Sequence, residues 1–244
     1  MDRALELTRQ AERTHFWFRG FRRFVAPVLH DLAGARRDLR LIDCGCGTGF
    51  NLNLLRPYGS VYGFDLSAGG VAHARRSGAN VVRGDVTRIP FVSNQFDIAT
   101  SFDVLQSVEG DQAAVREMAR VLRPGGAVVL TVAALEVLRG DHSIAWKEVR
   151  RYTPALARQL VCEAGLHPVR ASFPCASVFP LIAGVRVAQR ALRPFRGVRQ
   201  EADIRVPVAP VNALLTGLVS AEAALARHVP MPIGSSLLVV ARKD

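Results

Sequence analysis

Short apolar runs alternate with amphipathic stretches along the first two thirds of the chain. Runs with the length and composition of strands lie at about 40–44, 61–65, 80–83, 96–101 and 127–133. Helical patterns precede and separate them, at 15–33 and near 49–56, 68–77 and 112–122. Such alternation of strands and helices is typical of a parallel sheet with helices on both faces.

The last third of the chain begins with the same alternation. Thr153-Pro154 predicts the start of a helix, and Gly165 predicts its end. A sixth strand is expected at 169–173, and an apolar run at 236–241 predicts a late one.

A segment of about 60 residues, 174–234, separates these last two strands. It holds seven of the 13 prolines and two helical stretches. In the first stretch Arg186, Arg190 and Arg193 form a stripe largely opposite apolar residues, and the second, about 211–228, is apolar nearly all round. We expect a structural cap, with a substrate lid or a membrane-facing cap as alternatives.

Three glycines at every second position follow the first predicted strand. Gly45, Gly47 and Gly49 come directly after Asp43 and Cys44, and a helical pattern opens at Phe50. A strand, a glycine turn and a helix N-terminus form the nucleotide-binding arrangement of a doubly wound sheet. The G-x-G-x-G spacing differs from the dinucleotide fingerprint G-x-G-x-x-G, and the carboxylate of Asp43 suits a cationic ligand better than a pyrophosphate.

Further motifs follow in order along the chain. The second strand ends at Asp65, the third is followed by Asp85, and the fourth is followed by Asp103. Leu122-Arg123-Pro124-Gly125-Gly126 then leads into the fifth strand. As a set, the five pieces resemble the class I S-adenosylmethionine-dependent methyltransferases, in particular the ubiquinone/menaquinone methyltransferase-like group. The resemblance covers roughly residues 39–133.

The resemblance implies a fold and a division of the chain. The fold is a doubly wound, Rossmann-like α/β sheet of seven mostly parallel strands, with helices on both faces and a helical insertion before the last strand. The methyltransferase core takes residues 39–173 and 235–244, and the helical cap insertion takes 174–234. Residues 1–38 form an N-terminal helical segment that covers the cofactor site.

The resemblance also implies roles for individual residues toward S-adenosyl-L-methionine. Asp65 binds both ribose hydroxyls, a role that suits an ionised carboxylate because it accepts two hydrogen bonds at once. Asp85 accepts from the adenine amino group, and Arg19 meets the cofactor carboxylate. The full set of expected cofactor contacts is Arg19, Asp43, Cys44, Gly45, Gly47, Gly49, Asp65, Leu66, Asp85, Val86 and Phe102.

Catalytic groups on the acceptor side are less clearly marked. A general base is needed only if the acceptor is a weakly acidic hydroxyl or a carbon acid. His142 and Tyr152 are the candidates. The acceptor that the apolar insertion favours is a small or medium-sized, partly apolar molecule, and the methylated atom, O, C or N, stays open.

Charge and cysteine content bear on partners and compartment. The formal net charge is +11, from 32 basic and 21 acidic residues, but only Lys147 and Lys243 are lysines. The arginines are scattered, which disfavours nucleic acid as a partner. No cysteine or histidine cluster has metal spacing, so we expect free thiols and no structural zinc. The charged N-terminus does not resemble a secretory signal, so we expect a cytoplasmic enzyme, with peripheral membrane contact through 174–234 left open.

Two alternative functions remain at this point. A methyltransferase-fold protein acting on RNA, or one catalysing a reaction other than methylation, would carry the same motifs. A nicotinamide-dependent oxidoreductase would share the sheet, but the glycine spacing and Asp43 argue against it.

Overall fold

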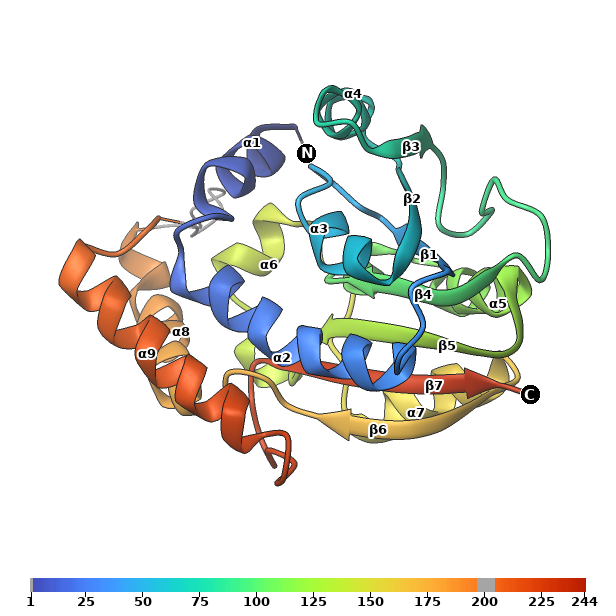
Figure 1. The fold of residues 1–244 in the computed structure, drawn as a ribbon. Coiled ribbons are helices and arrows are strands. Elements are labelled where there is room, and N and C mark those ends of the chain that lie inside the picture. The colour runs from blue at the N-terminus through green and yellow to red at the C-terminus, as the bar shows by residue number, and fades with distance from the viewer. Residues whose placement is uncertain (1, 197–204) are drawn as a thin grey trace.

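A computed structural model describes residues 2–196 and 205–244, with side chains described for 5–192 and 205–244. Its centre is a seven-stranded sheet in the order β3-β2-β1-β4-β5-β7-β6 (Figure 1). The strands are β1 (Leu39–Cys44), β2 (Gly59–Asp65), β3 (Asn80–Arg83), β4 (Phe96–Phe102), β5 (Leu122–Ala133), β6 (Leu166–Ser172) and β7 (Ser236–Lys243). The first five are parallel, and β7 runs antiparallel between β5 and β6. The expected mostly parallel sheet of seven strands is therefore confirmed.

Helices cover both faces of this sheet. The α-helices are α1 (Asp2–Ala11), α2 (Phe16–Ala33), α3 (Leu52–Leu55), α4 (Ala68–Arg76), α5 (Asp111–Val121), α6 (Asp141–Ala145), α7 (Pro154–Glu163), α8 (Phe179–Arg196) and α9 (Ala209–Leu225). Four 3-10 helices join them: η1 (Arg56–Tyr58), η2 (Leu105–Ser107), η3 (Glu136–Leu138) and η4 (Ala176–Val178).

Alternate residues of each strand point to opposite faces of the sheet. On β1, Leu41 packs with α2, α3 and α4, whereas the next residue, Ile42, packs with α5 and α7. This alternation makes two apolar layers, so the parallel strands are buried on both sides. The carboxyl ends of the parallel strands point to the side of the molecule where α1, α6 and the N-terminus of α2 lie (Figure 1).

Some boundaries differ from those expected from sequence. The helix expected at 49–56 is reduced to α3 and η1, because the Gly49 N–H bonds to the Cys46 carbonyl in a turn and Pro57 interrupts the following helix. Strand β5 begins at Leu122 because Leu122 already pairs with Phe96 before an irregularity in the register. The short helix α6 was not expected, and α1 is a separate helix before the one expected at 15–33, within the N-terminal segment expected to be helical.

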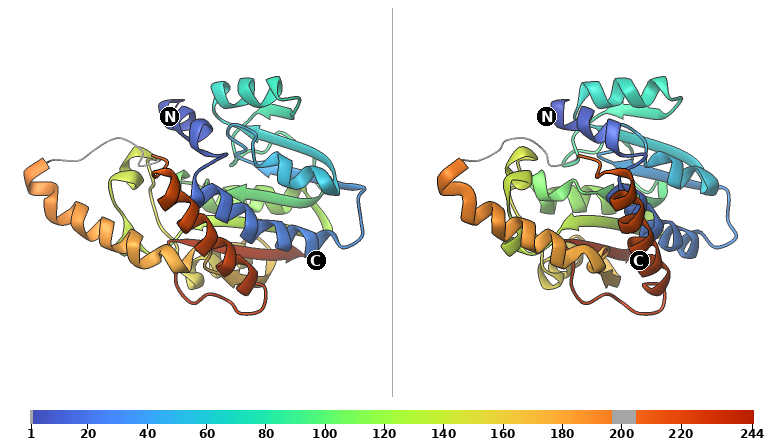
Figure 2. Two further views of the ribbon diagram at one scale, coloured as in Figure 1. Left: turned by 60° about the vertical axis from the view of Figure 1, so that its left-hand side comes forward. Right: turned by 90° about the vertical axis from the view of Figure 1, so that its left-hand side faces the viewer.

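The segment 174–234 forms η4, α8 and α9. Helix α9 packs along α2, where Val219 lies in a small apolar cluster with Phe16 and Phe24. Its buried Glu222 accepts hydrogen bonds from the backbone N–H groups of Ala176 and Ser177, at 2.7 and 2.8 Å. Helix α8 projects from this end of the molecule (Figure 2).

The α2–α9 contact generates a matched pair of substitutions. A Cβ on Gly20 of α2 would lie 2.1 Å from Val219 Cγ1, so Gly20→Ala forces α9 or Val219 to move. We expect a loss of about 1–2 kcal/mol in the free energy of unfolding. A Cβ on Gly217 of α9 meets nothing within 4 Å, so Gly217→Ala should stabilise by about 0.5–1 kcal/mol. Urea unfolding of both variants measures the difference, and equal effects would mean that α9 does not pack on α2 in solution.

Candidate functional site

The glycine loop leaves β1 and turns tightly across the end of β2. The backbone N–H groups of Gly45 and Cys46 both donate to the carbonyl of Phe64, at 2.9 Å each. Gly45 and Gly49 have positive φ angles of 84° and 80°. A Cβ would lie 2.5 Å from Val104 Cγ2 at Gly45 and 2.6 Å from Ala74 Cβ at Gly49. Glycine is therefore required here by backbone conformation and by close packing together.

Asp65, the last residue of β2, holds this loop in place. One carboxylate oxygen accepts the N–H of Gly47 and the other accepts the N–H of Ser67, both at 2.8 Å. The N-cap of α4 is Ser67, whose hydroxyl accepts from Gly70 N–H. Each oxygen of a carboxylate has a second lone pair, so Asp65 keeps capacity for two further donors such as a vicinal diol.

Asp43 lies beneath the loop in a very different environment. Its side chain is buried and accepts a hydrogen bond from the Thr100 hydroxyl at 2.7 Å. Burial raises its pKa to about 7, with a further rise from the negative charge of Asp65 and an opposing effect of the Thr100 bond. A cationic ligand group above the loop would favour the ionised form of Asp43.

The other residues expected to contact the cofactor follow the next strands of the sheet. Asp85 is exposed after β3, and one of its oxygens accepts from the backbone N–H and the hydroxyl of Thr87, both at 2.8 Å. Val86 beside it is buried, while Leu66 after β2 is exposed. Phe102 at the end of β4 is buried edge-on against Phe21 of α2, with ring centroids 5.0 Å apart.

The two cysteines of the loop are packing residues. Cys44 and Cys46 are buried free thiols, and desolvation raises the pKa of both. Cys46 packs against Gly63, where a Cβ would lie 3.0 Å from its sulfur. Neither thiol has the environment of a reactive thiolate.

The N-terminal segment touches the loop directly. A Cβ on Gly47 would lie 3.3 Å from Leu5 Cδ1, so the side chain of Leu5 from α1 sits over this glycine. The buried carboxylate of Glu12 accepts a hydrogen bond from the Thr48 hydroxyl at 2.7 Å, and burial raises its pKa. Glu12 and Thr48 were not among the residues expected from sequence.

Arg22 was also not among the residues expected from sequence, and its surroundings indicate a binding role. Its Nη2 donates to the Glu12 carbonyl at 2.7 Å, and its guanidinium lies 4.7 Å from the centre of the Phe50 ring. Within the described part of the chain, its Nη1 is buried without a hydrogen-bond partner. Burial lowers the pKa of Arg22, and the positive charge of exposed Arg19 lowers it further. A buried guanidinium nitrogen with a second cation nearby favours an anionic ligand group.

The two catalytic candidates lie in different settings. Tyr152 is fully buried, and its hydroxyl donates to Asp111 at 2.8 Å and lies 3.3 Å from the Leu105 carbonyl. Burial and then Asp111 raise its pKa. This placement favours a structural role and does not support Tyr152 as a proton-transfer group. His142 is half-buried on α6, with its ring centroid 6.1 Å from that of Trp146.

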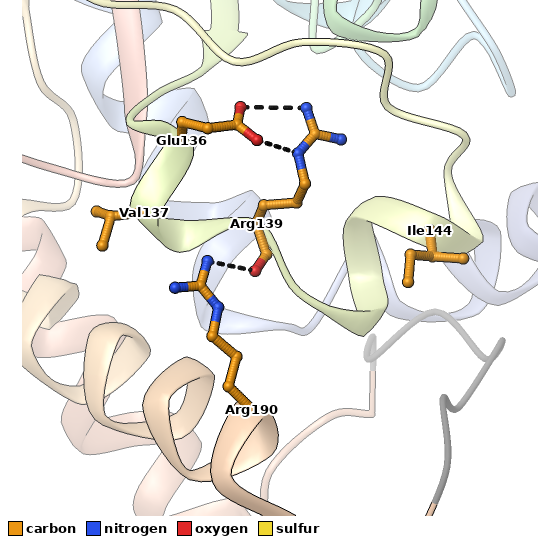
Figure 3. Close-up of a pocket in the computed structure, with 5 residues that line it drawn as sticks. All are labelled: Glu136, Val137, Arg139, Ile144 and Arg190. Carbon is orange, nitrogen blue, oxygen red and sulfur yellow. Dashed lines mark hydrogen bonds and ion pairs between the residues drawn. The ribbon is translucent and has the colours of Figure 1, made fainter. Parts of the chain in front are cut away.

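An open depression of about 400 Å³ lies apart from the glycine loop, between η3, α6 and α8. Apolar Val137 and Ile144 line it together with Glu136, Arg139 and Arg190 (Figure 3). Glu136 pairs with Arg139, and Arg190 donates to the Arg139 carbonyl at 3.0 Å. Most of the lining residues follow the carboxyl end of β5 along the chain, and Arg190 belongs to the cap insertion.

Comparison with known proteins agrees with this geometry. Residues 42–130 match the family described as "Methyltransferase domain". The malonyl-[acyl-carrier protein] O-methyltransferase of Enterobacter lignolyticus (strain SCF1) is 34% identical over 165 residues, covering 65% of each chain. The demethylmenaquinone methyltransferase of Roseiflexus sp. (strain RS-1) is 36% identical over 132 residues, which cover 50% of this chain and 54% of the relative. Residues 42–130 thus match a methyltransferase domain, and both of these relatives are named as methyltransferases.

The matched part spans less than two thirds of the length of either methyltransferase relative. A likeness in structure extends further along this chain. The [4+2]-cyclase SpnF superimposes with a TM-score of 0.58 and 22% identity, covering 90% of this chain and 79% of that one. At this identity the likeness concerns the fold alone.

The residues around the loop fit the cofactor of this methyltransferase family. Asp65 retains acceptor capacity, and Arg22, whose Nη1 has no hydrogen-bond partner, lies against Phe50 directly after the glycine loop. The signal for Arg22 was present in the sequence, since it lies one helical turn after Arg19. Only the packing of α2 shows which of the two guanidinium groups is buried.

The raised pKa of Asp43 predicts a pH dependence of stability. With a folded pKa of about 7 and an unfolded one of about 4, the folded chain binds this proton more tightly. The resulting stabilisation is fully present below about pH 4 and is lost as the pH rises through about 7. Asp43→Asn should therefore flatten this part of the curve of unfolding free energy against pH, measured by urea unfolding without cofactor. Identical slopes for wild type and Asp43→Asn would contradict the assignment.

Proposed function

We propose that this protein transfers the methyl group of S-adenosyl-L-methionine to a small or medium-sized, partly apolar acceptor. The observation that carries the proposal is Asp65 holding the glycine loop while keeping two acceptor positions free. That geometry suits a ribose diol, and the loop glycines suit the amino-acid end of the cofactor.

Different side chains of the protein bind different parts of the cofactor in this proposal. Asp65 accepts from the ribose hydroxyls and Asp85 from the adenine amino group. Asp43, beneath the loop, contributes negative charge toward the ammonium and sulfonium groups. We propose that Arg22 binds the cofactor carboxylate, in place of Arg19 as expected from sequence. Arg22 carries the buried, unpartnered nitrogen, whereas Arg19 is exposed.

The sulfonium supplies an already activated methyl group, so the protein's tasks are orientation and exclusion of water. The N-terminal segment suits the second task, because Leu5 sits over Gly47 and Glu12 ties the segment to Thr48. We propose that residues 1–38 cover the cofactor site. His142 remains the candidate for a proton-transfer group, because it is partly exposed on α6.

The acceptor is proposed from the cap and from the depression next to it. Val137 and Ile144 offer apolar contact there, while Arg139 and Arg190 offer hydrogen-bond donors. The two named relatives act on different acceptors, a malonyl group on acyl-carrier protein and demethylmenaquinone, so they support the small-molecule class without choosing within it. The methylated atom stays open.

A second candidate function is a reaction other than methylation on the same fold. The likeness to the cyclase SpnF is the specific observation that keeps it in view. Incubation with methyl-labelled cofactor and candidate acceptors separates the two, since a non-methylating protein would bind the cofactor and leave the label on it. Action on RNA would appear in the same assay as label in added RNA.

Cofactor binding tests the role of Asp65. Asp65→Ala removes two charge-assisted hydrogen bonds, so affinity for S-adenosyl-L-methionine should fall by about 2–4 kcal/mol in calorimetry. Asp38→Ala is the matched control, because Asp38 is exposed and pairs with Arg36. It lies before β1, at the amino end of that strand, whereas Asp65 lies at the carboxyl end of β2. Equal affinities of Asp65→Ala and wild type would reject the ribose assignment.

A truncation tests the proposed cover. Deleting residues 1–19 would cut into α2 and remove the buried Phe16, so the better truncation removes 1–11 and keeps Glu12. Loss of Leu5 should weaken cofactor affinity about tenfold, which corresponds to about 1.4 kcal/mol. Thermal unfolding of the truncated protein should remain cooperative. If the folded truncation bound S-adenosyl-L-methionine as tightly as wild type, the proposal that the N-terminal segment covers the cofactor site would be wrong.

A further inference from the structure

The outer face of α9 is apolar over its whole length. Leu214 is 73% exposed, and the other large side chains on this face are Val211, Leu218 and Leu225. The small residues exposed between them are Ala213, Gly217, Ala221 and Ala224. No charged side chain interrupts this face between Val211 and Leu225.

The polar groups of α9 are turned inward instead. Glu222 is buried and binds the N-terminus of η4, and Thr216 is buried with its hydroxyl bonded to the Asn212 carbonyl. Asn212 itself binds the Phe16 N–H and the Thr14 carbonyl at the start of α2. The inward face also carries apolar Val219 and Ala223, so α9 differs from an ordinary surface helix because its outer face is apolar where polar side chains are usual.

Helix α8 likewise exposes apolar side chains. Leu181, Val185 and Leu192 are exposed together with Gly184, Ala188 and Ala191. Its arginines touch the protein as well: Arg186 Cδ lies 2.7 Å from the Cβ position of Gly140, and Arg190, itself exposed, donates to the Arg139 carbonyl. Arg186 and Arg190 of the arginine stripe thus contact the protein, while the side chain of Arg193 lies outside the described residues.

Helices α8 and α9 lie at one end of the molecule, and α8 extends away from the sheet (Figures 1 and 2). Each helix thus exposes a row of apolar side chains, and we call these two rows together the apolar patch; exposed apolar groupings of this kind mark interaction sites. No helix in the described part of the chain is long and apolar enough to cross a membrane.

Charge indicates which occupant fits. Among residues 174–234 three are acidic, namely Glu201, Asp203 and Glu222, against the seven arginines 186, 190, 193, 196, 199, 205 and 227. Exposed Arg205 lies just before α9, and exposed Arg227 and His228 lie just after it. An apolar face with cations at both ends complements an anionic bilayer, which offers acyl chains beneath phosphate head groups.

The geometry points to α8 and α9 as an interfacial anchor that docks the protein on an anionic lipid bilayer. The apolar faces enter the acyl boundary, while Arg205 and Arg227 meet the head groups. This inference is independent of the proposed methyl transfer, because it uses none of the residues around the glycine loop.

Vesicle co-sedimentation of the full chain tests the anchor. Wild type should bind vesicles containing phosphatidylglycerol at least tenfold more tightly than pure phosphatidylcholine vesicles. Leu214→Gln/Leu218→Gln should lose at least tenfold on the anionic vesicles, and Arg205→Gln/Arg227→Gln should lose the preference for them. The matched control is Val92→Gln/Val169→Gln, at sites that are also exposed but lie away from the cap, and it should bind as wild type does.

The outcomes separate the occupants of the patch. Absence of wild-type binding to the anionic vesicles overturns the proposal, and so does equal binding by the leucine and control variants. If the leucine variant instead converts a dimer to a monomer in light scattering while vesicle binding stays unchanged, the patch belongs to a second copy of the chain. Calorimetry with S-adenosyl-L-methionine should give equal affinities for wild type and all variants, which keeps this test apart from that of the proposed function.

Discussion

The carboxylate of Asp65 is the interaction on which the site depends. It fixes Gly47 of the loop and Ser67 at the start of α4 against the end of β2, so three elements meet at one anion. The charge of Asp65 also adds to the raised pKa of Asp43 below it. Two carboxyl groups thus lie close together in a chain whose formal net charge is +11, and a cationic ligand group beside them would favour the ionised form of Asp43.

Helix α2 connects this site to the cap. At its N-terminal end, Arg22 and the neighbouring Glu12 reach the glycine loop, while Gly20 on the same turn receives Val219 of α9. The arrangement depends on a residue without a Cβ at Gly20, because any larger side chain would push α9 away. The placement of the apolar patch is therefore tied to the helix that borders the cofactor site.

The loop, the order of the acids and the sheet could be predicted from sequence, because strand periodicity, glycine spacing and strand-end acids are local patterns. Arg22, Glu12 and Leu5 could not, because their roles depend on how α1 and α2 return over residues distant in the chain. The orientation of α8 could not be predicted either, for a related reason. Periodicity identifies two opposite faces of a helix, and only tertiary packing decides that Arg186 and Arg190 contact the protein. Likewise, the burial of Tyr152 against Asp111 depends on contacts across the fold.

A crystal structure with S-adenosylhomocysteine tests the central claim most directly. The account predicts both ribose hydroxyls within hydrogen-bond distance of the Asp65 carboxylate, with the Gly47 and Ser67 bonds retained. It also predicts the ligand carboxylate at the buried nitrogen of Arg22. A ligand whose ribose lies away from Asp65, or whose carboxylate leaves Arg22 Nη1 without a partner, would contradict it.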